Sequence, residues 1–110
     1  MRIILSGVAF KTSEPLREYA EHRVQSWLGH LERRLDVVTV QLANEDGQDG
    51  RRARCRLLAR PVRGASLAVD LVVEATSADI YEAIDLAPER MARAFELATQ
   101  KRRRPVQAGV

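Results

Sequence analysis

The spacing of apolar residues changes along the chain, and each change marks an expected boundary between secondary-structure elements. In the first third, apolar side chains recur at steps of three and four, the period of one buried helical face. These residues are Leu16, Tyr19, Ala20, Val24, Trp27, Leu28, Leu31 and Leu35. Ser13 precedes them as a capping residue, and Gly29 predicts close packing or a local bend. We expect Tyr19 and Trp27 to pack in the core rather than to stack on bases.

A period of two replaces this helical period and predicts strands. Residues 2–6 are apolar and β-rich enough to form a first strand. Between residues 36 and 74, three alternating stretches are separated by the turn-rich residues 44–50 and 61–64. The expected inward positions are Val38, Val40 and Leu42, then Ala53, Cys55, Leu57 and Ala59, then Leu67, Val69, Leu71 and Val73. The alternation predicts a meander of three half-buried strands.

The opposite face of this meander carries charged residues. Arg54, Arg56 and Arg60 alternate with the inward positions of their strand. Asp70 and Glu74 occupy the corresponding face of the next strand. Because opposite charges on neighbouring strands attract, we expect these arginines to pair with the acids rather than to contact RNA.

A second helical stripe fills the last third of the chain. Its members are Ile80, Ile84, Ala87, Met91, Ala94, Phe95 and Ala98. Asp79, with Glu82 three residues later, predicts a capping-box-like start of the helix. Pro88 removes one backbone donor inside the helix, so it predicts a kink or a local break.

The order of elements is β-α-β-β-β-α and predicts an α+β fold. Both helices are expected on one face of a four-stranded sheet, which gives a two-layer sandwich. The β-β-β-α half is also the pattern of double-stranded-RNA-binding domains, although a shared fold does not by itself fix a function. We expect residues 1–104 to form a single domain and residues 105–110 to form a disordered tail.

Composition narrows the function classes. The 110 residues carry a net charge of +3, with a pI near 9.6, which favours an anionic partner. The lone Cys55 excludes an internal disulfide and is expected to be a small buried thiol. The absence of a membrane-spanning run and of a signal peptide predicts a cytoplasmic protein.

No motif in the chain indicates catalysis. His22 and His30 lie eight residues apart without a carboxylate or cysteine at ligand spacing, which argues against a metal site. We therefore expect a protein that is not an enzyme. As a separate expectation, the protein is a monomer. No cofactor, metal, small-molecule substrate or membrane partner is expected.

Basic residues on the second helix are the main functional feature. Arg90, Arg93, Lys101 and Arg104 recur at helical steps, so they share a face beside the buried one, and Arg102 and Arg103 add to the density. The acids of this helix are expected at a different azimuth, so they would not neutralise that face; they are Glu82, Asp85, Glu89 and Glu96. A row of cations on a rigid helix is suited to phosphate contacts. Its alternative interpretation is an ordinary solvated face.

The run Asp79-Ile80-Tyr81-Glu82-Ala83-Ile84-Asp85, followed by this basic helix, resembles the ribosome hibernation-promoting factor and ribosome-associated inhibitor A family, which includes sigma-54 modulation protein-like sequences. Residues 13–19 are similar to the family's first helix entry, and the likeness reaches about residue 103. It implies rRNA contacts by Arg90, Arg93 and Lys101, which fall at matching positions. The rising density of basic residues toward the C-terminus favours further contacts by Arg102, Arg103 and Arg104. Arg23 matches a position that is often basic. Leu97 and Thr99 occupy positions at which family members often have a basic residue.

This resemblance implies a short-form, ribosome-associated translation inhibitor. Such a protein binds the small ribosomal subunit and its rRNA near the mRNA and tRNA channel, and occludes the channel under stress. Two alternatives remain open: a protein-interaction module of the same fold that no longer binds ribosomes, and a general double-stranded RNA binder.

Overall fold

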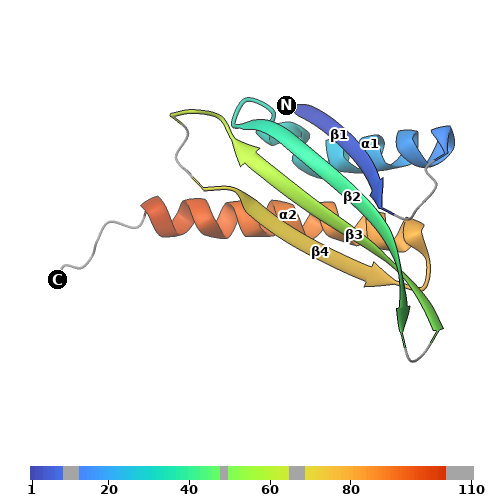
Figure 1. Cartoon of the computed structure of the whole chain (residues 1–110). Coiled ribbons are helices and arrows are strands. Elements are labelled where there is room, and N and C mark those ends of the chain that lie inside the picture. The colour runs from blue at the N-terminus through green and yellow to red at the C-terminus, as the bar shows by residue number, and fades with distance from the viewer. Residues whose placement is uncertain (9–12, 48–49, 65–68, 104–110) are drawn as a thin grey trace.

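The structure is a computed structural model of the chain, and it describes residues 1–8, 13–47, 50–64 and 69–103. Strand β1 (Arg2–Val8) is followed by helix α1 (Glu14–Leu28) and by a short 3₁₀ turn, η1 (Gly29–Leu31). Strands β2 (Leu35–Gly47), β3 (Gly50–Pro61) and β4 (Leu71–Ser77) come next, and helix α2 (Ile80–Arg103) comes last. The predicted β-α-β-β-β-α order is confirmed (Figure 1).

The sheet has the order β1-β2-β3-β4, with β1 parallel to β2 and the other pairs antiparallel. Both helices cover the same face of this sheet, as Figure 1 shows, so the predicted two-layer α+β architecture is confirmed. The inward residues of the two central strands form the sheet's half of the core; they are Val38, Val40, Leu42, Cys55, Leu57 and Ala59, each at most 1% exposed. Arg54, Arg56 and Arg60 lie on the face that the helices leave uncovered.

Helix α1 begins as the sequence predicts. The Ser13 hydroxyl accepts a hydrogen bond of 3.3 Å from the Leu16 backbone N–H, which satisfies one of the donors left free at the helix start. The helix buries a narrow row spaced by four residues, namely Leu16, Ala20, Val24 and Leu28. At Gly29 the α-helix tightens into the 3₁₀ turn.

Trp27 is not part of the core, and that prediction is wrong. Its side chain is 36% exposed, whereas Val24 and Leu28 are almost completely buried. The physical reason is that the contact between α1 and the sheet is narrow. Only the row of buried residues described above faces the sheet. Tyr19, Arg23 and Trp27 form a second row, also spaced by four residues, along the edge of α1. Tyr19 on this edge is only partly buried.

Helix α2 starts at the predicted place but with different cap chemistry. The Asp79 carboxylate accepts a 3.0 Å hydrogen bond from the Tyr81 N–H, and its carbonyl accepts one of 3.1 Å from the Ala83 N–H. The Asp79 N–H donates to the Ser77 hydroxyl at 3.3 Å. Ser77 therefore takes the role that the capping-box prediction gave to Glu82.

Pro88 lies fully buried inside α2, which runs without interruption from Ile80 to Arg103. The predicted local break is therefore wrong, and Figure 1 shows one continuous helix. The helix buries Ile84, Met91 and Phe95 against the sheet and α1. This burial holds the helix together across the missing donor of Pro88.

Two strand boundaries differ from the predictions. Residues 44–47 form strand rather than turn, because β2 and β3 stay paired as far as Gly47 and Gly50; the two residues between them lie outside the described chain. Gly50 has φ 108°, a backbone conformation that favours glycine. Strand β4 begins only at Leu71, so Val69 lies before it and is 60% exposed instead of inward. Leu67 lies outside the described residues, and Ala75 continues the buried face.

Candidate nucleic-acid interface

Arg90 ties α2 to the edge of the sheet. Its Nη1 donates a 2.7 Å hydrogen bond to the backbone carbonyl of Glu74. Strand β4 is an outer strand, so its outward backbone groups have no strand partner, and Arg90 supplies one. Arg90 is exposed, but part of its hydrogen-bonding capacity already serves the fold.

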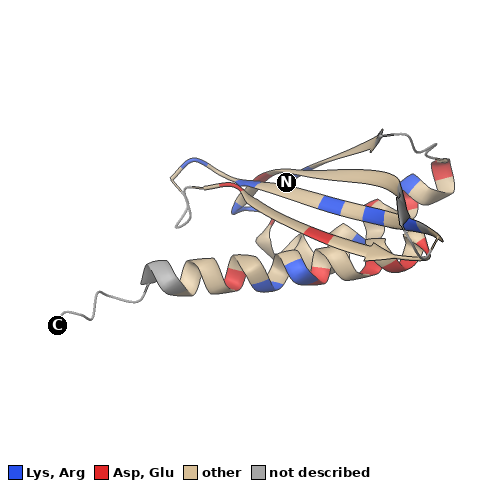
Figure 2. Ribbon diagram, turned by 60° about the horizontal axis from the view of Figure 1, so that its bottom comes forward, with Lys and Arg blue, Asp and Glu red and all other residues tan. Residues whose placement is uncertain are grey.

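Arg93 is a highly exposed residue of the predicted basic row. Its side chain is 76% exposed and lies 3.2 Å from the Glu89 carboxylate, one helical turn earlier. The expectation that the acids of α2 leave the basic face without neutralisation is therefore wrong at this position. Figure 2 shows acidic and basic residues mixed along α2. An exposed pair at this spacing contributes only about 0.3–0.5 kcal/mol, so a phosphate can replace Glu89 at little cost.

The C-terminal part of the predicted basic row is described only in part. Lys101, Arg102 and Arg103 belong to the last turn of α2, and their side chains lie outside the described structure. Arg104 and the predicted tail, residues 105–110, lie outside the described residues altogether. Their roles stay predictions.

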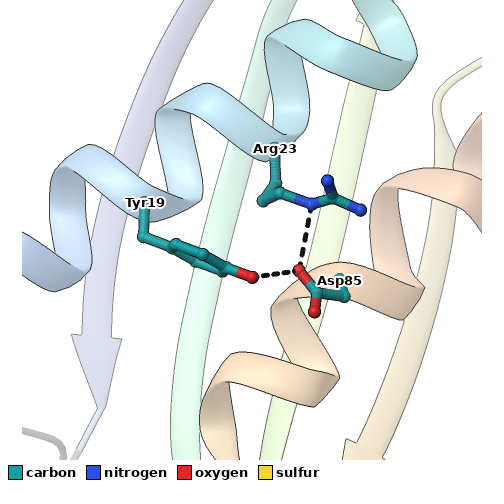
Figure 3. Close-up of polar contacts among 3 residues, drawn as sticks. All are labelled: Tyr19, Arg23 and Asp85. Atoms are coloured by element: carbon teal, nitrogen blue, oxygen red, sulfur yellow. Dashed lines mark hydrogen bonds and ion pairs between the residues drawn. The ribbon is translucent and has the colours of Figure 1, made fainter.

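Arg23 faces α2 instead of projecting alone from α1. Its Nε lies 2.9 Å from Asp85 Oδ1, an ion-pair distance, although its N–H is not aligned for a hydrogen bond. The Tyr19 hydroxyl donates a 2.6 Å hydrogen bond to the same oxygen. Figure 3 shows the two α1 side chains converging on the carboxylate of α2. The pKa of the Tyr19 hydroxyl is raised above its ordinary value, first by this hydrogen bond and then by partial burial.

The run of residues 79–85 owes its pattern to this helix pair. Asp79 caps α2 and Asp85 binds the two α1 side chains. The Tyr81 ring meets the Tyr19 ring edge to face, with centroids 5.0 Å apart and planes at 78°. This contact gives Tyr81 a structural role, and the run fixes how α2 lies against α1.

The arginines on the uncovered face of the sheet are paired with acids. Arg56 Nε lies 3.6 Å from Glu74 Oε1, and Arg60 Nε lies 3.8 Å from Asp70 Oδ1. This confirms the predicted cross-strand pairing for these two arginines. Arg54 also has an interaction partner. Acids therefore offset much of the positive charge on this face of the sheet, which makes it poorly suited to phosphate contacts.

The structure also contains a cleft that the sequence analysis missed. It has a volume of about 550 Å³ and lies between the end of α1 with η1 and the C-terminal half of α2. Trp27, His30 and Arg34 line one side, and Arg93, Glu96 and Gln100 line the other. The spacing of four residues that links Tyr19, Arg23 and Trp27 was the available signal, because it places Trp27 on the edge that faces α2.

Other chemistry is sparse in the described part of the chain. Burial raises the pKa of the Cys55 thiol to about 12, and the side chain is 1% exposed, as expected for an inward core residue. Among the described residues, no group of three or more His, Cys, Asp or Glu side chains is placed to hold a metal ion. The described helices include none that is long and apolar enough to cross a membrane.

Comparisons with known proteins point to one family. Residues 3–103 match the family described as sigma 54 modulation protein / S30EA ribosomal protein. The fold is similar to the N-terminal domain of Thermus thermophilus Protein Y, with 23% identity and a TM-score of 0.67 over 88% of this chain and 98% of that one. It is also similar to a ribosomal subunit interface protein from Coxiella burnetii, with 16% identity and a TM-score of 0.69 over 88% and 99%. Comparison with curated protein sequences gave no significant match.

Proposed function

Since this chain belongs to the sigma 54 modulation protein / S30EA ribosomal protein family, a ribosome-associated family, we propose that it binds the small ribosomal subunit near the mRNA and tRNA channel and occludes that channel. The family match over nearly the whole chain carries this proposal. Binding would stop translation and preserve idle ribosomes under stress, in the cytoplasm where ribosomes work. The mechanism is steric and needs no bond-making step.

The exposed side of α2 supplies the phosphate contacts in this proposal. Arg93 combines high exposure with a weak ion pair that a phosphate can replace. Lys101, Arg102, Arg103 and Arg104 continue the row toward the C-terminus. Arg90 contributes its charge from a fixed position on the sheet edge, because the Glu74 carbonyl holds it there.

Arg23 is assigned a different part in this interface. Its ion pair with Asp85 orients α1 against α2 and so sets the spacing between the helices. Because its side chain is 32% exposed, Arg23 can add a lesser electrostatic contact to rRNA from that position. Replacing it would disturb the fold and the interface together, so it is a poor choice for a first test.

The test compares two single charge reversals. Arg93→Glu changes the proposed contact surface, and Arg60→Glu makes the same change of charge on the sheet face, where the side chain is 67% exposed. Arg90 is avoided because its replacement would also remove the bond to β4. Each purified variant is sedimented with isolated small subunits and with whole ribosomes across a salt series.

Wild-type binding should weaken steeply as salt rises, because each neutralised phosphate contributes about 0.7–0.9 to the log–log slope. Arg93→Glu should bind more weakly and lower that slope by about 1, whereas Arg60→Glu should behave as wild type. Binding that is indifferent to salt, or equal losses in the two variants, would contradict the proposal. Tight binding to free duplex RNA would favour a general RNA binder, and failure to sediment at any salt would favour a protein-interaction module.

A further inference from the structure

The cleft beside Trp27 has a clear structural origin. Along the edge of α1, Tyr19 and Arg23 meet Asp85 of α2, so the helices are in contact at that level. Two turns beyond Tyr19, α2 presents the small Ala92, which leaves space in front of Trp27. The resulting cleft of about 550 Å³ lies within the usual range for ligand-binding clefts, roughly 300–1,000 Å³.

The lining of the cleft combines a flat aromatic surface with cations. The Trp27 side chain is 36% exposed, although tryptophan has one of the largest apolar surfaces that a protein can bury. The Arg34 guanidinium lies 4.9 Å from the centre of the Phe95 ring of α2, so a cation stacked on an aromatic ring also lines the cleft. Aromatic rings and guanidinium planes are the surfaces on which proteins stack unpaired bases.

The charges around the cleft favour an anionic ligand. Arg34 and Arg93 line the cleft, and Glu96 is the acid among the lining residues. The formal charge of the lining is therefore positive when His30 is counted as neutral. Gln100 adds an amide that can donate or accept a hydrogen bond at a base edge. Arg93 belongs both to this lining and to the proposed phosphate-contacting row, so the two surfaces are continuous.

We propose that this cleft receives one unstacked base of ribosomal RNA, with Trp27 as the stacking surface and Arg93 at the neighbouring phosphate. The proposal rests on the proposed ribosome binding and adds a base-binding site to it. Stacking does not distinguish strongly between bases, so the cleft would add affinity and position rather than sequence reading.

Three variants test this site. Trp27→Leu removes the aromatic ring, Trp27→Phe keeps a smaller ring, and Val72→Ala changes another exposed apolar residue, 48% exposed on β4 and not among those lining the cleft. Circular dichroism and thermal unfolding check the fold of each variant. Affinity for isolated small subunits is measured by sedimentation at one fixed salt concentration.

Trp27→Leu should weaken binding by roughly five- to 150-fold, which is the range that one base–aromatic stack provides. Trp27→Phe should retain most of the affinity, and Val72→Ala should match wild type. Wild-type affinity in Trp27→Leu would overturn the base-binding site while leaving the proposed function intact. Failure of the wild-type protein to bind would instead overturn the proposed function.

Chemical probing of the small-subunit rRNA separates RNA from protein as the occupant. The probes are dimethyl sulfate and a carbodiimide, applied to subunits saturated with wild type or with Trp27→Leu. One or a few adjacent nucleotides should change reactivity between the two complexes while the remaining footprint stays the same. Identical footprints despite weaker binding would assign the cleft to a ribosomal protein and overturn the proposal.

Discussion

Asp85 is the residue at which the two helices depend most directly on each other. One of its carboxylate oxygens accepts a hydrogen bond from the Tyr19 hydroxyl and also lies within ion-pair distance of Arg23. Its side chain is 39% exposed, so water competes for both contacts. The contacts therefore contribute more to the relative position of the helices than to the free energy of unfolding.

Tyr19→Phe tests this arrangement at its hydroxyl. The variant should lose about 1 kcal/mol of unfolding free energy at neutral pH, since it removes one hydrogen bond to a carboxylate. The folded protein raises the pKa of Tyr19 above 10.0, so the stabilising effect is complete below pH 10.0 and is lost as pH rises through the folded-state value. Urea denaturation at neutral and strongly alkaline pH measures the difference between wild type and variant.

The same titration with Tyr81→Phe provides the control. Tyr81 contributes the ring of the edge-to-face contact, which phenylalanine preserves. The unfolding free energy of Tyr81→Phe should therefore match that of wild type at neutral pH. A difference between wild type and Tyr19→Phe that grows as pH rises above 10.0 would contradict the assignment of the raised pKa to the hydrogen bond with Asp85.

At the scale of the element, α2 contains a proline, a residue that is unfavourable in the interior of a helix. Pro88 lacks the N–H that would bond the carbonyl of Ile84, yet the helix continues through it. Its ring is fully buried, so part of the cost is offset by apolar contacts. The balance of these two effects is measurable.

Pro88→Ala should leave the protein about 1 kcal/mol more stable, because restoring a helical residue is worth about 3 kcal/mol and losing two buried methylenes costs about 1.6 kcal/mol. Urea denaturation gives this difference directly. Destabilisation by Pro88→Ala would show that the packing of the proline ring, and not the backbone of α2, dominates at this position. Leu97→Ala, at an exposed site on the same helix, is the matched control and should change stability little.

The elements were predictable where one periodic signal acts alone. The four-residue row of α1 and the alternation of β2 and β3 specify which side faces the core. Boundaries failed where pairing between strands decided the outcome. The β2–β3 ladder continues to Gly47 and Gly50 through residues that look turn-rich, and the β3–β4 ladder begins only at the pair Ala59 and Leu71.

The candidate site was predictable only as a row of charges. Sequence spacing places Arg90 and Arg93 on one side of α2, but it carries no information about the Glu74 carbonyl, which comes from another element. For the same reason the partner of Arg23 was hidden, because Asp85 lies far along the chain. The cleft at Trp27 depends on a gap between two helices, which no single helical pattern contains.

At the scale of the whole molecule, Cys55 reports on the cooperative core. It lies inward on the central strand β3, 1% exposed, and the helices cover that face. Burial raises its pKa to about 12, so the reactive thiolate is scarce in the folded state at neutral pH. The sequence contains one cysteine, so a thiol reagent reports on this position alone.

Alkylation of Cys55 should therefore require opening of the core, and its rate should follow the unfolding free energy measured with urea. By the proposed function, small subunits bind the folded chain, so in excess they should slow alkylation by about the ratio of their free concentration to the dissociation constant. Mass spectrometry of the labelled chain measures both rates. Without subunits, Cys55 in Arg93→Glu should be alkylated as fast as in wild type. With subunits in excess, the variant should gain much less protection than wild type. Protection that is equal in the two proteins would place the ribosome-binding surface away from α2.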